Sequence, residues 1–196
     1  LILITPDSER TMCTFLGTAG KISDHDIKEE EIKNAEMVFL EGYLWDEGKP
    51  QKAFDKAITH SKKVAMSLSD LFCVERHKTN FLELVKNQLD IVFANEQEML
   101  SLINAKSFEE AVSFSKEIKK NIIITRGEKG AVSINEDEIV EIKANSNLNI
   151  KDLTGAGDLF AAGYLHGVIN NFKIKECLTK GTELSSKIIQ KIGARI

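Results

Sequence analysis

Short apolar runs alternate with amphipathic stretches through most of the chain. The apolar runs read as buried strands, and the stretches between them show the spacing of an amphipathic helix. Strands that alternate with helices in this way are typical of crossover units on a parallel sheet with both faces covered. The expected strands are 36–45, 63–70, 89–95 and 121–127. The expected helices are 51–62, 96–103 and 108–119, with 80–87 as the clearest part of another helix.

The two ends of the chain depart from this alternation. Residues 1–17 predict a β-hairpin, because apolar and β-branched runs flank the turn-forming Pro6-Asp7-Ser8. Ser23 predicts the start of a helix, since the acidic residues that follow it suit the positive end of a helix dipole. From Gly155 to Ile192 the pattern is helical, with a break expected around 170–172.

A different pattern precedes this helical part. Residues 131–135 and 138–144 form two short alternating runs joined by an acidic turn, which suits an antiparallel pair near a sheet edge. No internal repeat, linker or shift of composition marks a domain boundary. With 196 residues and 42% hydrophobic content, the sequence predicts a single α/β domain over 1–196 with one core.

Charge and cysteine content narrow the class of protein. The net charge is −4 with acids and bases mixed along the chain, so the sequence predicts no nucleic-acid partner and no binding to an anionic membrane. No apolar run approaches the roughly 20 residues that span a bilayer. Cys13, Cys73 and Cys177 are far apart and odd in number, which favours reduced thiols in a cytoplasmic protein.

A glycine-rich loop, Thr154-Gly155-Ala156-Gly157, leads into a helix whose first carboxylate is Asp158. The loop lacks the Lys-Ser/Thr pair of a P-loop, and Phe160 replaces the last glycine of GxGxxG. A NAD-dependent dehydrogenase is therefore disfavoured. The amides of 155–157 can approach an anion, and a helix N-terminus adds partial positive charge. The loop predicts an anion site suited to a phosphoryl group in transfer.

An aspartate beside an anion site needs a reason, because its charge repels the anion. Asp158 can orient a substrate hydroxyl and accept its proton while that hydroxyl attacks the terminal phosphate of a nucleotide. The alternative is that Asp158 only caps a helix and that the glycines only make a turn. Local chemistry leaves both interpretations open.

Three further groups of residues lie at the ends of predicted strands, where open α/β sheets bind ligands. Asn95 and Glu98 fit a helix cap as well as a ligand contact. The T-x-G-x-x-G spacing of Thr125, Gly127 and Gly130, taken alone, fits a hairpin turn with glycines at positive φ. Glu41 and Tyr43 end an earlier strand, where they can face a substrate or pack at a buried edge.

The stretch "DLTGAGDLFAAGYLHG" closely resembles the C-terminal signature of the ribokinase/PfkB family of carbohydrate and nucleoside kinases, often written DTxGAGD. Asn95-x-x-Glu98 resembles the NxxE motif of that family, and "ITRGEKGA" resembles its ATP-contact loop. "KGTELSSKIIQKIGAR" resembles its last helix, beside the adenine. The four motifs occur in the family's order, and the upstream stretches "ITPDSERTM", "LEGYLW" and "SLSDLFCVERH" look closest to bacterial members labelled adenosine kinase or sugar kinase.

The resemblance implies a ribokinase-like three-layer α/β/α sandwich with a mostly parallel central sheet. It implies an ATP-dependent kinase that phosphorylates a primary hydroxyl of a nucleoside or sugar, with adenosine favoured. Asp158 would be the catalytic base, and Gly155, Ala156 and Gly157 the anion hole. Further implied contacts are Asn95, Glu98, Thr125, Gly127, Gly130, Thr182 and Ser185 for the nucleotide, and Glu98 for Mg²⁺ through water. The candidate substrate contacts are Glu41 and Tyr43, from their place at the end of a strand.

Some positions depart from the family pattern. Asp152 and Thr154 match positions near a monovalent-cation site, for K⁺, in some members, but Leu153 stands where a Thr is often found. Thr182 stands where many members carry Asn, which weakens the expected adenine contacts. A homodimer is also expected from the resemblance.

The amino-terminal segment of the family, with its first signature and most of its sugar site, has no counterpart in the sequence. The chain is therefore expected to be an N-terminally incomplete fold that carries the ATP-binding half. We expect the chain by itself to be a poor kinase or inactive, because orientation of the acceptor hydroxyl contributes much of catalysis. A second hypothesis is a non-catalytic nucleotide-binding or subunit-interaction module derived from the same fold.

Overall fold

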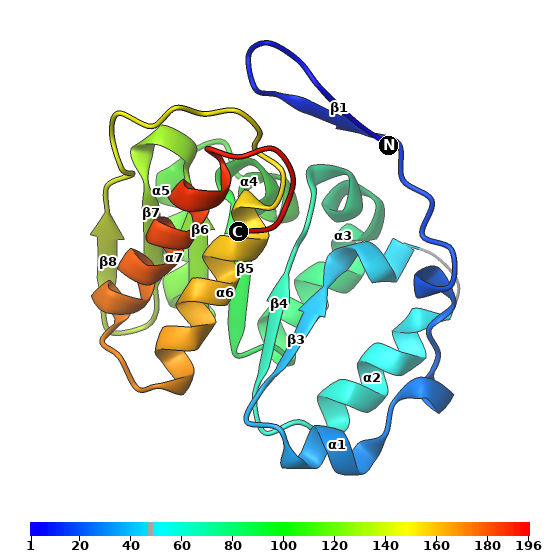
Figure 1. Ribbon diagram of the computed structural model, residues 1–196. Helices are drawn as coiled ribbons and strands as arrows, with labels where there is room; N and C mark the ends of the chain where they lie inside the picture. The colour runs from blue at the N-terminus through cyan, green and yellow to red at the C-terminus, as the bar shows by residue number, and fades with distance from the viewer. Residues whose placement is uncertain (47–48) are drawn as a thin grey trace. The chain divides into compact units, whose positions relative to one another are not determined.

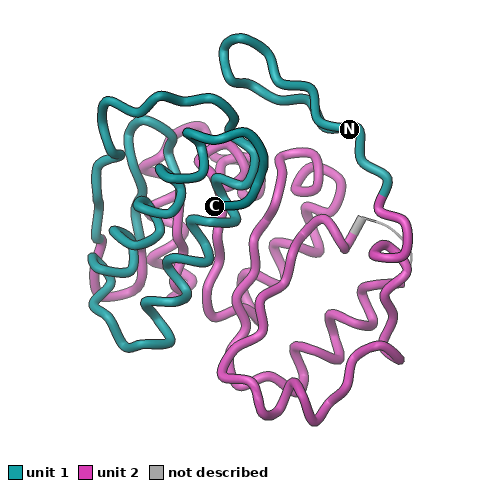
Figure 2. The backbone as a smooth tube through the Cα atoms, viewed as in Figure 1, with its two compact units in different colours: residues 1–15, 125–133, 140–196 teal, residues 16–124, 134–139 magenta. Residues whose placement is uncertain are grey.

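The computed structural model describes residues 1–46 and 49–196. The chain divides into two compact units, each built from segments that are far apart in the sequence (Figure 2). Unit 1 contains 1–15, 125–133 and 140–196, and unit 2 contains 16–124 and 134–139. The single domain expected over 1–196 stays a prediction.

The main sheet has six strands, and they follow one another in sequence order (Figure 1). Its strands are β3 (Val38–Glu41), β4 (Val64–Ser67), β5 (Ile91–Asn95), β6 (Asn121–Thr125), β7 (Ala131–Ile134) and β8 (Ile139–Ile142). β3 pairs in parallel with β4, and β4 with β5. The connections from β6 to β7 and from β7 to β8 are too short for the crossover that parallel neighbours need. A mostly parallel, mixed sheet flanked by helices confirms the predicted fold class.

The described part of unit 2 contains five α-helices and a buried apolar core. The helices are α1 (Glu29–Asn34), α2 (Pro50–His60), α3 (Leu71–Asn87), α4 (Glu96–Ile103) and α5 (Phe108–Glu117). Met66 of β4, Phe81 of α3 and Val92 of β5 are fully buried in that core. The Asp70 side chain caps α3 by accepting a hydrogen bond from the Phe72 amide, and α3 is kinked at His77. α3 therefore contains 80–87, the clearest part of the expected helix, and begins earlier, at Leu71, directly after its cap.

Two expectations for unit 2 are wrong in detail. The strand expected over 36–45 ends at Glu41, and a 3₁₀-helix, η3 (Gly42–Asp46), follows it. The main chain of Gly42 lies against Leu68, so close that a Cβ would come within 2.8 Å of the Leu68 carbonyl oxygen. Ser23 is an N-cap residue as predicted, and its amide donates to Asp26 Oδ2 at 2.8 Å in a capping box. The helix that it begins is only the short 3₁₀-helix η2 (Asp24–Asp26), and α1 begins later, at Glu29. At Glu41 a tertiary contact outweighs the local apolar pattern.

Unit 1 contains the predicted hairpin and a pair of packed helices. β1 (Ile2–Ile4) and β2 (Arg10–Met12) pair antiparallel, with Ile2 opposite Met12. The helices α6 (Ala156–Ile169) and α7 (Ile174–Ile188) are separated by the expected break. They approach closely at Gly163, where a Cβ would lie 2.6 Å from the Lys180 carbonyl oxygen. The remaining 3₁₀-helices are η1 (Ala19–Lys21) in unit 2 and η4 (Gly127–Lys129) in unit 1.

Across the described residues, the helices all fall short of the length and apolar content that crossing a membrane requires.

Candidate functional site

A cavity of about 480 Å³ lies within unit 1. Its walls come from the hairpin turn, the loop after β6, the segment from 144 to 150, the start of α6 and one face of α7. The cavity therefore brings together sequence-predicted residues from three separate motifs, namely Thr125, Gly127, Gly130, Ala156, Gly157, Thr182 and Ser185.

The lining is mostly apolar with a few polar groups, as is typical of small-molecule sites. Leu148, Phe160 and Ile189 form apolar wall, and Thr182 and Ser185 contribute hydroxyls from α7. The cavity residues on α7 recur at spacings of three and four positions, so one face of this helix borders the cavity. An apolar cavity of this kind suits the planar ring of a nucleotide, while the start of α6 contributes backbone amide groups.

The glycine loop presents free backbone amides at the start of α6. Gly155 is the N-cap residue, with a φ of +80° and no side-chain cap. The Ala156 amide donates to the Leu153 carbonyl oxygen at 3.2 Å. Within the described part of the chain, the amides of Gly155, Gly157 and Asp158 donate to no other group. Three unused donors at a helix N-terminus form a concave arrangement that favours an anion.

Asp158 lies in the first turn of α6 and is exposed. Among the residues that the structure describes, its carboxylate accepts no hydrogen bond and forms no ion pair. A carboxylate that caps a helix accepts from a backbone amide of that helix, so the capping alternative lacks its characteristic hydrogen bond. The glycine alternative is correct in one respect, because Gly155 does make a left-handed turn.

Asp152 lies just before the glycine loop and is buried, with 1% of its surface exposed. Its Oδ1 accepts from the Thr154 amide at 2.8 Å, and its Oδ2 accepts from the Gly193 amide, also at 2.8 Å. Burial alone raises the pKa of Asp152. The hydrogen bonds from Thr154 and Gly193, with the charge of Arg10, outweigh that effect and lower the pKa below its ordinary value.

Thr154 has a buried hydroxyl, Oγ1, with no hydrogen-bond partner in the described residues. A buried hydroxyl of this kind beside a loop that contains a buried carboxylate fits the oxygen ligands that a monovalent cation prefers. The described residues include no group of three His, Cys, Asp or Glu side chains that could hold a metal ion.

The loop after β6 contains two glycines at positive φ. Gly127 has a φ of +57° and Gly130 a φ of +99°. The Arg126 amide donates to the Gly130 carbonyl oxygen at 2.8 Å and closes the turn. The expected glycine turn is therefore present, and the same turn lines the cavity together with Thr125. The turn interpretation and the ligand-contact interpretation are compatible.

Several cavity residues have no local signal in the sequence. Asp7 and Glu9 reach the cavity from the hairpin turn, where the Ser8 hydroxyl donates to the Ile150 carbonyl oxygen at 3.0 Å. Asn145 also lines the cavity, and its Nδ2 donates to Ser186 Oγ at 2.9 Å. These positions depend on contacts between distant residues, so no local pattern reveals them.

The remaining predicted residues lie in unit 2, at the carboxyl ends of its parallel strands. Asn95 and Glu98 form a capping box at the start of α4: the Asn95 amide donates to Glu98 Oε2 at 2.9 Å, and the Glu98 amide donates to Asn95 Oδ1 at 2.8 Å. The helix-cap interpretation of this pair is therefore correct for the backbone. Burial, with the charges of Asp70 and Glu41, raises the pKa of Glu98 to about 7.

Glu41 and Tyr43 share a partner at the end of β4. Ser69 Oγ donates to Glu41 Oε2 at 2.9 Å, and the Tyr43 amide donates to Ser69 Oγ at 3.3 Å. The Tyr43 side chain is 41% exposed. The ends of β3, β4 and β5 thus gather the carboxylates of Glu41, Asp70 and Glu98, and the charges of the first two act on Glu98.

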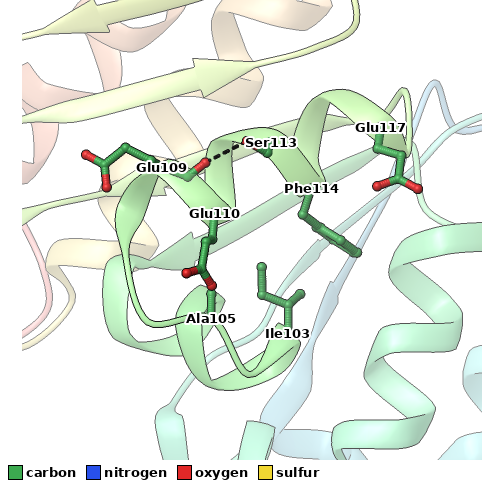
Figure 3. Close-up of a pocket in the computed structure, with 7 residues that line it drawn as sticks. All are labelled: Ile103, Ala105, Glu109, Glu110, Ser113, Phe114 and Glu117. Atoms are coloured by element: carbon green, nitrogen blue, oxygen red, sulfur yellow. Dashed lines mark hydrogen bonds between the residues drawn. The ribbon is translucent and has the colours of Figure 1, made fainter.

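A second hollow, of about 430 Å³, lies between the end of α4 and α5 in unit 2 (Figure 3). Its floor is apolar, from Ile103 and Phe114, and part of its rim is acidic. The Glu110 carboxylate already accepts a hydrogen bond from the Lys106 amide at 3.0 Å. None of the sequence-predicted site residues lines this hollow, so it is not part of the candidate site.

The raised pKa of Glu98 predicts a pH dependence of stability. The pKa is about 7 in the folded protein against an ordinary value of 4.5, so folding takes up a proton between these pH values. The contribution to stability is fully present below pH 4.5 and is lost as the pH rises through 7, a change of about 3 kcal/mol. Glu98→Gln should flatten the fall of the unfolding free energy between pH 5 and 8, measured in urea without Mg²⁺.

Glu96→Gln, in the same turn of α4, is the matched control and should keep the wild-type slope. Parallel pH profiles for the wild type and Glu98→Gln would contradict the assignment of the slope to this carboxylate.

The sequence and the fold of this chain are similar to those of known proteins. The whole chain, residues 1–196, matches the family described as pfkB family carbohydrate kinase. The structure of adenosine kinase from Sinorhizobium meliloti is 35% identical, with a TM-score of 0.96 over 100% of this chain and 61% of that chain. Adenosine kinase from Schistosoma mansoni, solved with 2-fluoroadenosine, is 22% identical and shares the fold, with a TM-score of 0.87 over 100% of this chain and 63% of that chain.

A curated relative is the cytidine kinase of Thermococcus kodakarensis, which is 31% identical over 138 residues. The match covers 67% of this chain and 49% of that protein. The chain thus spans about half the length of this relative and about three fifths of the solved structures. Because the family match extends over every residue, the chain belongs to the pfkB family of carbohydrate kinases.

Proposed function

We propose that the protein containing this chain transfers the γ-phosphoryl group of ATP to a primary hydroxyl of a nucleoside or sugar. The hydroxyl oxygen forms the new bond to phosphorus as the bond between phosphorus and the ADP oxygen breaks. Asp158 accepts the proton that the hydroxyl loses, and the amides of the loop from Gly155 to Gly157 stabilise the phosphoryl group in transit.

The observation that carries this proposal is the combination at the start of α6. An exposed carboxylate without a hydrogen-bond partner in the described chain directly follows unused backbone amides. Ala156 and Gly157 of the same loop line the cavity. A carboxylate beside an anion site repels the anion, but it is useful there when it accepts the proton of the attacking hydroxyl. Since the Ala156 amide is engaged with Leu153, we assign the anion contacts to the amides of Gly155, Gly157 and Asp158.

Kinases of this family use ATP and Mg²⁺. We assign the base and ribose of ATP to the cavity residues Thr125, Gly127, Gly130, Thr182 and Ser185. Mg²⁺, when bound with ATP, supplies positive charge to the phosphates. We assign Glu98 a contact to Mg²⁺ through water, because both of its oxygens accept hydrogen bonds from Asn95 and leave few lone pairs for direct ligation.

We further propose a monovalent cation near Asp152 and Thr154. The support is the unpaired buried hydroxyl of Thr154 and the buried carboxylate of Asp152. A cation there would supply positive charge behind the glycine loop, and it would give the Thr154 oxygen a partner.

For the acceptor, we favour adenosine over other nucleosides and sugars, with contacts from Glu41 and Tyr43. The support is the similarity to the Sinorhizobium meliloti adenosine kinase, at 35% identity. The similarity to a cytidine kinase keeps a pyrimidine nucleoside as the next candidate.

The test is ADP formation by the full-length protein with adenosine, cytidine, ribose and fructose, each in K⁺ and in Na⁺ buffer. We expect turnover to be fastest with adenosine and to need K⁺. Turnover with a sugar alone would reject the choice of adenosine, and equal rates in both buffers would reject the cation. ATP binding without turnover on any acceptor would favour a non-catalytic nucleotide-binding module. The cytoplasmic location and the homodimer stay predictions from the sequence.

A further inference from the structure

We infer that the turn after α7 positions the phosphoryl-binding loop, with Ile189, Gly193 and Ala194 acting as a brace behind it. The inference rests on the proposed function, because it gives these residues a role in the geometry of that transfer. Ile189 also forms part of the cavity wall, and the brace acts on the loop through Asp152 and Gly155.

The brace contacts the loop through its backbone. The Lys151 amide donates to the Ile189 carbonyl oxygen at 2.8 Å, and the Asp152 amide donates to the same oxygen at 3.3 Å. The Gly193 amide donates to Asp152 Oδ2 at 2.8 Å, while Asp152 Oδ1 holds the Thr154 amide. The buried carboxylate thus joins two backbone segments 41 positions apart.

The brace also limits the position of Gly155. A Cβ on Gly155 would lie 3.0 Å from the Ala194 Cβ and 3.2 Å from its Cα, so the two main chains are close together. Because α6 has no side-chain N-cap, the direction of its first amides depends on the backbone angles of Gly155, whose φ is +80°. A residue that packs against Gly155 therefore influences where those amides point.

The first test is a double-mutant cycle in the full-length protein. Gly155→Ala should lower kcat at least tenfold, because the new Cβ strains the backbone and displaces the loop from Ala194. Adding Ala194→Gly to Gly155→Ala should recover kcat at least threefold, because it removes the nearer of the two contacts, the one to the Ala194 Cβ. Ile192→Ala and Ile196→Ala, exposed residues of the same tail, should leave kcat unchanged. Strictly additive effects in the cycle would overturn the role of Ala194.

The second test does not depend on turnover. Asp152→Asn should accelerate amide hydrogen exchange at least tenfold at Thr154 and Ala156, the hydrogen-bonded amides of the loop, with exchange in the hydrogen-bonded amides of α7 unchanged. It should also lower kcat more than it raises the KM for ATP. Equal acceleration throughout the protein would mean a general loss of stability and would overturn the inference. If the wild type transfers no phosphoryl group, the proposed function fails, whereas the exchange measurement still decides whether the brace holds the loop.

Discussion

Asp158→Asn is expected to lower kcat of the full-length protein by about 10²–10⁴-fold, the range in which a positioned general base contributes. Asparagine has the shape of aspartate but cannot accept the hydroxyl proton. The Asp158 carboxylate has no hydrogen bond or ion pair among the described residues, so its replacement by an amide breaks no side-chain hydrogen bond. The expected result is therefore a large loss of rate with little change in the midpoint of thermal unfolding.

ATP binding separates the catalytic role from a structural one. Removing a negative charge beside the anion site relieves repulsion, so the affinity for ATP should stay equal or rise. Glu30→Gln is the matched control, since Glu30 is also an exposed acid in the first turn of a helix, α1. It should keep wild-type kcat. A kcat for Asp158→Asn within threefold of the wild type would reject Asp158 as the base.

The elements that sequence predicts well are those decided by local pattern. The hairpin around Pro6-Asp7-Ser8 and the break between α6 and α7 occur where turn residues and apolar period agree. The strand predicted over 121–127 also occurs, and it ends two residues earlier, at Thr125. β3 shows the opposite case. The apolar run continues to Trp45, but the close approach of Gly42 to Leu68 ends the strand at Glu41. Leu68 is far from Gly42 in the sequence, so the local pattern around Gly42 cannot predict this contact.

The candidate site likewise contains residues that a local sequence pattern predicts and residues that only tertiary contacts bring to it. The loop at 155–158 has a recognisable order of glycines and acid, because phosphate chemistry needs free amides next to each other in the chain. Asp7, Glu9 and Asn145 come to the cavity through tertiary structure. The capping box of Asn95 and Glu98 shows a further limit, because one short motif serves a helix start and can also serve a ligand. Residue type alone does not separate these roles.

Gly130→Ala is expected to destabilise the protein by about 2–6 kcal/mol, more than Gly127→Ala in the same motif. Gly130 has a φ of +99° and a ψ of −138°, a region that is almost exclusive to glycine and costs other residues about 1–3 kcal/mol. A Cβ there would lie 2.0 Å from the Ile142 carbonyl oxygen and 2.8 Å from the Ala144 amide nitrogen. The contacting atoms belong to the backbone of 142–144, which cannot rotate away as a side chain can. Overpacking therefore adds about 1–3 kcal/mol to the loss of stability.

Gly127 isolates the conformational part of this cost. Its φ of +57° is the ordinary left-handed region, and its Cβ would meet no atom within 4 Å. Gly127→Ala should therefore cost only about 1–2 kcal/mol. Urea unfolding of the two variants measures the difference, and ATP titration at a temperature where both are folded should show the larger loss of affinity for Gly130→Ala. Equal losses of stability would mean that positive φ alone explains both glycines. A larger loss for Gly130→Ala means that Gly130 is required because the backbone of 142–144 packs directly against it, where Gly130 and Ala144 form part of the cavity wall.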